Sequence, residues 1–314
     1  MARRRTRGIV KVHPDRLRSF LQGGNRGKRR PPHPAGQPLA PGFTAEHRLD
    51  MANHGGKTLA SLSFLNVYLG SGRWSTSDMT NIDRALAGAM SDRSLNDVVQ
   101  QYFNPQPLAT TFLGSKKSDA PVAATFDRDA VSSTLDQLVQ AGQLENLNFA
   151  TTVVNLLLPP GTVLDSSGTG AERQGGDADD RDSSREGLGG YHGSHRAANG
   201  TQIYFAAAVY SQELPNGPNG IPIWPESWKN VVATLYHELN EARTDADVEL
   251  VNATGNERLL GWYSQTGGEI GDIPITAAGD NLHLVFVEKT IGTGDVVPIQ
   301  LLWSNAAGGP GEPF

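Results

Sequence analysis

Hydrophobic residues along this chain of 314 residues form two kinds of pattern, which are continuous apolar runs and apolar positions spaced three or four apart. The runs are bounded by glycine, proline or polar turns, as is typical of buried β-strands. The run at 151–158, for example, is stopped by Pro159, Pro160 and Gly161. The strands predicted in this way are 63–69, 151–158, 203–210, 282–287 and 297–303.

The spaced pattern predicts helices between these strands. One helix begins near Ser77, and two more are predicted at 95–102 and 129–140. Strands that alternate with helices indicate a mixed α/β fold. We therefore predict one α/β (α+β) domain over residues 58–305.

A further helix is predicted between residues 228 and 242. His237 and Glu241 are four residues apart, so they project from the same side of this helix, opposite the centre of its apolar stripe. The ordinary interpretation of such a pair is a solvated polar face, but the absence of Lys and Arg between Asn230 and Ala242 favours the floor of a cleft. The stripe consists of Trp228, Val231, Val232, Leu235, Leu239 and Ala242.

The sequence from His237 to Glu241 reads H-E-L-N-E and places an imidazole and two carboxylates within one and a half helical turns. Zincin metallopeptidases carry H-E-x-x-H, in which both imidazoles bind zinc and the Glu is the general base. Here the carboxylate of Glu241 replaces the second imidazole, and carboxylate oxygen is also a zinc ligand. The motif predicts Zn²⁺ held by His237 and Glu241, with Glu238 as the catalytic base.

Two other segments offer a third metal ligand. Glu269 and Asp272 lie among glycines that would let the backbone turn back over the helix. Upstream, His192 and His195 lie in a glycine-rich segment, 189–195, that is expected to be a loop. All four residues remain candidate metal ligands at this point.

Several segments match those of a known family in order and spacing. They are Y-H-E-L-N-E-A-R-T-D at 236–245, G-W-Y at 261–263, G-E-I-G-D at 268–272 and G-Y-H-G at 190–193. On these residues the chain resembles the phosphate-induced protein 1 or EXORDIUM-like family in its bacterial form, over roughly residues 62–303. The resemblance implies a zincin-like mixed sheet with an active-site helix carrying H-E-x-x-E, but no particular reaction.

Composition limits the chemistry. The chain has no Cys, which excludes disulfides, thiolate ligands and a cysteine nucleophile, so any metal must be held by His, Asp, Glu, backbone or water. No apolar run approaches the roughly 18–20 residues that span a bilayer. Members of the family that the chain resembles are commonly exported, and the plant members contain cysteines. This chain shows neither a secretory h-region nor cysteines, so we expect a cytoplasmic protein, or one exported without a classical signal peptide.

Charge is distributed unevenly along the chain. Residues 1–30 hold eleven Lys or Arg and one acid, whereas the remainder holds sixteen basic and thirty-two acidic residues. We expect residues 1–57 to be a basic, flexible tail that binds an anionic partner, is recognised by a secretion or packaging machine, or folds against the acidic body. Residues 306–314 are expected to be a flexible tail, and residues 165–190, which are acidic and almost without apolar residues, a disordered insertion.

Together these observations predict a zinc-dependent metallohydrolase, most simply a peptidase-like enzyme that cleaves a peptide or another acyl bond with metal-activated water. The alternative is a noncatalytic module with a structural metal site that binds glycan or protein through its aromatic residues. An open coordination position distinguishes the two, because catalytic zinc keeps a water ligand and structural zinc does not.

Overall fold

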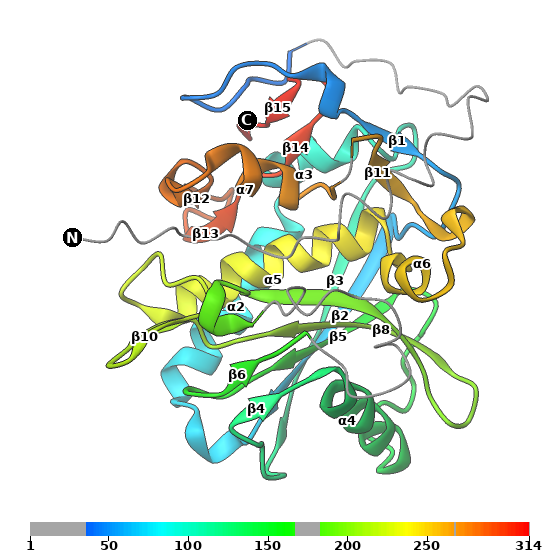
Figure 1. The fold of residues 1–314 in the computed structure, drawn as a ribbon, viewed down its shortest axis with the longest axis vertical. Coiled ribbons are helices and arrows are strands. Elements are labelled where there is room, and N and C mark those ends of the chain that lie inside the picture. The colour runs from blue at the N-terminus through cyan, green and yellow to red at the C-terminus, as the bar shows by residue number, and fades with distance from the viewer. Residues whose placement is uncertain (1–35, 167–182, 267, 314) are drawn as a thin grey trace.

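The computed structural model describes residues 36–166, 183–266 and 268–313. The predicted mixed α/β fold is confirmed by a central five-stranded sheet with helices on both faces (Figure 1). Two predicted segments lie partly outside the described residues. They are the basic tail, at residues 1–35, and the insertion, at residues 167–182. No helix in the described part of the chain is both long and apolar enough to cross a membrane.

The central sheet has the strand order β3-β2-β5-β8-β7. Four of its strands are parallel, and β7, at one edge, runs antiparallel to β8. Parallel strands are covered on both faces, which explains why all six residues of β5 are buried. The strands are β2 (Ser61–Leu69), β3 (Ala109–Ser118), β5 (Thr152–Leu157), β7 (Gly190–Arg196) and β8 (Gln202–Ala208).

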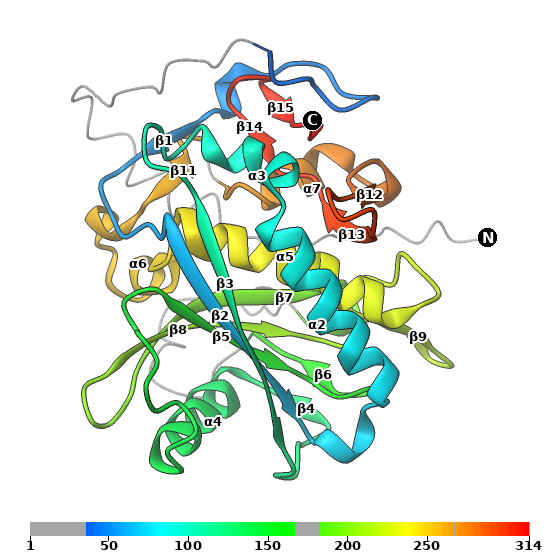
Figure 2. The ribbon, with the colours of Figure 1, turned by 180° about the vertical axis from the view of Figure 1, so that it is seen from behind.

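Helices cover the two faces of the sheet unequally. Each face of the sheet has its own hydrophobic core. On one face α4 (Arg128–Gln140) packs on the smaller of these two cores, which includes Leu135 and Val154. On the other face α2 (Thr76–Ser91) and α5 (Ser227–Thr244) pack on the larger core, as the reverse view shows (Figure 2). The helix predicted near Ser77 therefore exists, and it is capped by Ser75, whose side chain accepts from the Asp78 amide.

A third layer covers the side of α5 that faces away from the sheet. The hairpin of β12 (Phe286–Thr290) and β13 (Val296–Gln300) lies there with α7 (Asp272–Ala278) (Figure 1). Enclosed on both sides, α5 is buried from Asn230 to Thr244. The interpretation of this polar side as a solvated surface is therefore wrong, because a layer built from later parts of the sequence covers it.

The remaining elements are short and complete the layers. They are β1 (Met51–Asn53), α3 (Arg93–Gln100), β4 (Thr125–Phe126), β6 (Val163–Leu164), β9 (Gln212–Leu214), β10 (Gly217–Asn219), α6 (Val248–Thr254), β11 (Trp262–Ser264), β14 (Trp303–Ser304), β15 (Gly309–Pro310) and 3₁₀ turns at His47–Leu49, Ser71–Arg73, Ser184–Glu186, Glu257–Leu259 and Leu282–Leu284.

The described parts of the two predicted tails make backbone contacts with distant segments, and residues 307–311 of the C-terminal one are buried. The Ala40 amide donates to the Pro310 carbonyl at 2.9 Å, and Leu39 bridges Gly311. Met51, which is buried, pairs with Ser264 in the β1–β11 ladder. The expected boundaries at 57 and 306 differ from the structure because backbone pairing between remote segments leaves no mark in local composition.

Three further local predictions need correction. The segment 189–195, expected to be a loop, forms most of the edge strand β7. Of the predicted strand at 282–287, the first half is the 3₁₀ turn Leu282–Leu284, and its last two residues belong to β12. Within the expected insertion at 165–190, Ser184 and Leu188 are buried. Glycines that allow close approach to α5 hid β7 in the sequence, because glycine normally signals a turn.

Candidate metal centre

The H-E-x-x-E segment lies in the middle of α5, at the level where β7 and the third layer meet the helix. His237 and Glu241 face α7 and β13, whereas Glu238 is turned toward β7. The three side chains are almost fully buried, with residue exposures of 5%, 3% and 3%. Buried charged groups are costly unless they are paired or bind a metal, so the imidazoles and carboxylates of this cluster must balance one another or hold an ion.

His237, Glu241 and Asp272 form one group that could hold a metal ion. The Nε2 atom of His237 lies 3.0 Å from Oε2 of Glu241 and 3.7 Å from Oδ1 of Asp272. Asp272 is the first residue of α7, so the return of the chain over α5, which the glycines at 268 and 271 permit, places it there. Of the two candidate ligands in this segment, Glu269 and Asp272, it is Asp272 that joins His237 and Glu241 in this group.

A glutamine from β13 orients His237. The amide nitrogen of Gln300 donates to the carbonyls of Gly271, at 2.9 Å, and Leu301, at 2.7 Å. Its Oε1 atom is therefore the acceptor for the Nδ1–H of His237. This bond fixes the tautomer in which Nε2 carries the lone pair, as outer partners of metal-binding histidines do. Gln300 was not predicted from the sequence, because it stands in an apolar strand with no metal motif near it.

Glu241 is oriented in a similar way by backbone groups. Its Oε1 atom accepts from the amides of Gly271, at 3.0 Å, and Asp272, at 3.2 Å, which leaves Oε2 directed at His237. Gly271 is required by close approach, since a Cβ atom there would lie 2.5 Å from Nδ1 of His237 and 2.9 Å from Oε1 of Glu241. The loop at 268–272 therefore packs closely on His237 and Glu241 and leaves no room for a side chain at Gly271.

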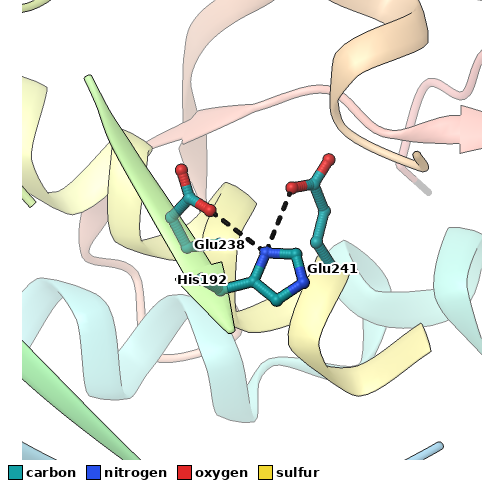
Figure 3. A group of neighbouring side chains, drawn as sticks. All are labelled: His192, Glu238 and Glu241. Atoms are coloured by element: carbon teal, nitrogen blue, oxygen red, sulfur yellow. Dashed lines mark hydrogen bonds and ion pairs between the residues drawn. The ribbon is translucent and has the colours of Figure 1, made fainter. Parts of the chain in front are cut away.

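His192 reaches the same cluster from β7, as Figure 3 shows with Glu238 and Glu241. Its Nδ1 atom lies 3.3 Å from Oε2 of Glu238 and 3.5 Å from Oε2 of Glu241. Its Nε2 atom lies 3.1 Å from the Asp245 carbonyl and 3.5 Å from Oε1 of Glu269. His192, Glu238 and Glu241 form a second group that could hold a metal ion, and it shares Glu241 with the first group.

His195, the other histidine considered, lies elsewhere. Its Nε2 atom is 3.1 Å from Oδ1 of Asp136, on α4. Side chains of a strand alternate between its two faces, so residues three apart in β7 point in opposite directions. His192 consequently faces α5 and His195 faces α4, which removes His195 from the candidate metal ligands.

Burial and mutual repulsion dominate the electrostatics of the cluster. Burial raises the pKa of Asp272 and Glu269 well above the ordinary range, and the carboxylate of Glu241 raises both further. Glu241 is the exception, because His237 and His192 outweigh burial and lower its pKa to about 2. Without a cation, the site therefore holds protons on carboxyl groups that a metal ion would displace.

The donor set fits a divalent cation. In the described part of the chain, buried oxygens of Asp245, Glu269 and Asp272 have no hydrogen-bond partner. Imidazole nitrogen and carboxylate oxygen are ligands of zinc and of neighbouring divalent metals. Unsatisfied buried oxygens beside two imidazoles are therefore explained by a metal ion more simply than by a hydrogen-bonded polar core.

A small pocket opens onto His237 and Glu238. The edge strand comes close to the helix here, since a Cβ atom at Gly190 would lie 3.2 Å from Oε1 of Glu238 and 2.6 Å from the Ala207 carbonyl. The pocket combines this polar floor with apolar walls. Its lining consists of Gly189, Gly190, Ile221, Thr234, His237, Glu238, Ile275 and Phe286.

The aromatic residues considered for a glycan-binding surface are largely interior. Trp262, Tyr263 and Trp303 are buried in hydrophobic clusters, while Trp224 and Trp228 are partly buried against the larger core. Burial fits the general role of large aromatic side chains in cores. These residues therefore form no exposed stacking platform.

Comparisons with known proteins add little to this geometry. No family model matches the sequence, and no curated protein matches it. One solved structure that matches is the metalloproteinase-II of Bacteroides fragilis, with 10% sequence identity and a TM-score of 0.26; the match covers 62% of this chain and 44% of that one. A likeness of this size carries no argument about fold or activity, and the resemblance to EXORDIUM-like proteins stays a prediction.

Proposed function

We propose that the protein is a metal-dependent hydrolase, with Zn²⁺ as its ion and a peptide or related acyl compound as its substrate. The observation that carries this proposal is the convergence of His237, Glu241 and Asp272 beside a second buried glutamate, Glu238. Three protein ligands leave a coordination position open, which is the arrangement of catalytic rather than structural zinc.

The residues of the site have different tasks in this proposal. His237, Glu241 and Asp272 hold the ion, which when bound lowers the pKa of a water molecule and polarises the scissile carbonyl. Glu238 accepts the proton of the attacking water, since its Oε1 atom lies 4.0 Å from Nε2 of His237 and its side chain lines the pocket. Gln300 positions His237 and does not contact the substrate.

The raised affinity of Glu238 for a proton suits this role. Burial raises the pKa of its carboxyl, although the charges of His237 and His192 oppose that effect. A general base works best when its pKa lies near the operating pH. The pocket beside Glu238 is small and has apolar walls from Ile221, Ile275 and Phe286, which suits a water molecule next to the proposed base.

Elemental analysis of the purified protein tests the metal centre. We expect bound divalent metal in the wild type, less in His237→Ala, and the wild-type amount in the control His283→Ala, which changes an exposed histidine of the third layer. Hydrolysis of a mixed peptide library should require the metal and stop when a chelator removes it. A wild-type protein that contains no metal and cannot be loaded would overturn the proposed function.

Metal binding is expected to depend strongly on pH. Burial disfavours the protonated form of His237, but the carboxylates of Glu241 and Glu238 outweigh it and raise its pKa to about 10. The stabilisation that this proton gives the metal-free fold is complete below the ordinary pKa of 6.5 and is lost as the pH rises through about 10. Because a metal ion binds the neutral imidazole, it must expel this proton at neutral pH.

The apparent affinity for Zn²⁺ should therefore rise at least about tenfold per pH unit between roughly pH 6.5 and 9. Titration calorimetry in two buffers of different ionisation enthalpy should show proton release on binding. An affinity that does not change over this range would mean that the metal binds away from His237.

A further inference from the structure

We propose that the site binds two divalent cations rather than one, with the carboxylate of Glu241 bridging them. This inference rests on the proposed function and adds a second ion held by His192, Glu241 and Oε2 of Glu238, so that Oε1 of Glu238, which faces His237, keeps its role as the base. The first ion remains with His237, Glu241 and Asp272, so Glu241 belongs to both groups of ligands.

The hydrogen bonds of His192 carry the first step. The Asp245 carbonyl, 3.1 Å from Nε2, can only accept, so Nε2 carries the proton of the neutral ring. Nδ1 then has a lone pair, and it faces Oε2 of Glu238 at 3.3 Å and Oε2 of Glu241 at 3.5 Å. Nδ1 and these two carboxylate oxygens thus converge on one space, where a divalent cation that displaces the ring proton can bind all three.

The same arrangement occurs at His237, from the other side of the cluster. Its Nδ1–H is bound by Gln300, and its Nε2 faces Oε2 of Glu241 at 3.0 Å, where a metal ion would replace the proton. Two imidazoles from different elements, each with its outer nitrogen bound, thus direct their inner nitrogens at the same oxygen of Glu241. A carboxylate between two such positions is typical of paired metal ions about 3.5–4 Å apart.

The charge of the cluster supports two ions. If all five carboxylates were ionised and both imidazoles neutral, one divalent cation would leave a formal charge of −3 and two would leave −1. Oε1 of Glu269, on a side chain that is 4% exposed, has no hydrogen-bond partner among the described residues and lies 3.5 Å from His192. The five buried carboxylates are Glu238, Glu241, Asp245, Glu269 and Asp272.

The donors define the kind of ion. Oxygen and imidazole nitrogen without sulfur suit Zn²⁺, Mn²⁺ and Fe²⁺. Mn²⁺ is the most useful probe, because it is paramagnetic and two Mn²⁺ ions bridged by a carboxylate give an exchange-coupled spectrum that differs from that of isolated ions.

Equilibrium dialysis of the full chain against Mn²⁺ tests the inference. We expect two ions per wild-type chain and one per His192→Ala chain, with the first ion still held by His237, Glu241 and Asp272. His195→Ala is the matched control, since it removes the other histidine of β7, on the opposite face of the sheet, and should leave two ions bound.

The outcomes separate the two proposals. One ion in the wild type, retained in His192→Ala, would overturn the paired site and leave the proposed function standing, whereas no ion in any form would overturn both. Two ions that both persist in His192→Ala would place the second ion elsewhere and also overturn the paired site. If His192→Ala does not fold, the wild-type spectrum decides, because an exchange-coupled pair supports the bridge and an isolated-ion spectrum refutes it.

Discussion

Replacement of Glu238 by glutamine is expected to lower hydrolysis by roughly 10²-fold or more while the ion held by His237, Glu241 and Asp272 stays bound. The amide keeps the shape of the side chain but cannot accept the proton of the attacking water. Turnover of a peptide substrate and metal content would be measured on the same preparation. A variant that keeps full activity would remove Glu238 from the reaction.

Glu241→Gln is the informative counterpart, because the same chemical change is made one turn further along α5. Here the charged ligand is lost, so the affinity for metal should fall by more than the 10–100-fold typical of an outer-shell partner. Glu226→Gln, at the exposed start of the helix, is the control and should change neither property. Equal metal affinity in Glu238→Gln and Glu241→Gln, with no activity to lose in the wild type, would favour a noncatalytic binding module.

A second large effect is expected from Gly271→Ala. The added methyl group would lie 2.5 Å from His237 and 2.9 Å from a Glu241 oxygen, so either the loop or the ligands must move. Overpacking of this kind typically costs about 1–3 kcal/mol of stability. The displacement also acts on both ligands at once, so the loss of metal affinity should be at least as clear as the loss of thermal stability.

Gly72→Ala separates this steric effect from a general cost of replacing glycine. A Cβ atom at Gly72 meets nothing within 4 Å, so its melting temperature and metal content should match those of the wild type. Thermal unfolding and metal titration on both variants are the measurements. A Gly271→Ala protein with unchanged affinity would show that the 268–272 loop does not define the metal centre.

Local pattern alone predicted the elements whose apolar residues are dense or periodic. The run at 151–158 and the stripe at 228–242 led to β5 and α5, because a strand buried on both faces or a helix packed on a core imposes its period on the sequence. The edge strand β3 was not predicted, since its residues alternate between exposed and half-buried. An edge strand with few buried residues leaves little apolar signal.

The residues of the site also fall into those that local pattern predicted and those that it did not. His237, Glu238 and Glu241 were recognised because the helix fixes their spacing within five residues. The choice among Glu269, Asp272, His192 and His195 lay beyond the sequence, since it depends on how strands and loops return to α5. Strand alternation in β7 selects His192 over His195, but only once that segment is known to be a strand.

By itself, then, the sequence determined the mixed α/β class, the helix and the chemistry of its H-E-x-x-E residues, because each depends on neighbours within a few positions. Tertiary structure decided what covers that helix. The third layer buries the polar side of α5 and brings Asp272 and Gln300 onto His237, whereas β7 of the central sheet brings His192 to Glu241. The contacts of His237 with Asp272 and Gln300 and of His192 with Glu241 join residues 35 to 63 positions apart, and no local period records them.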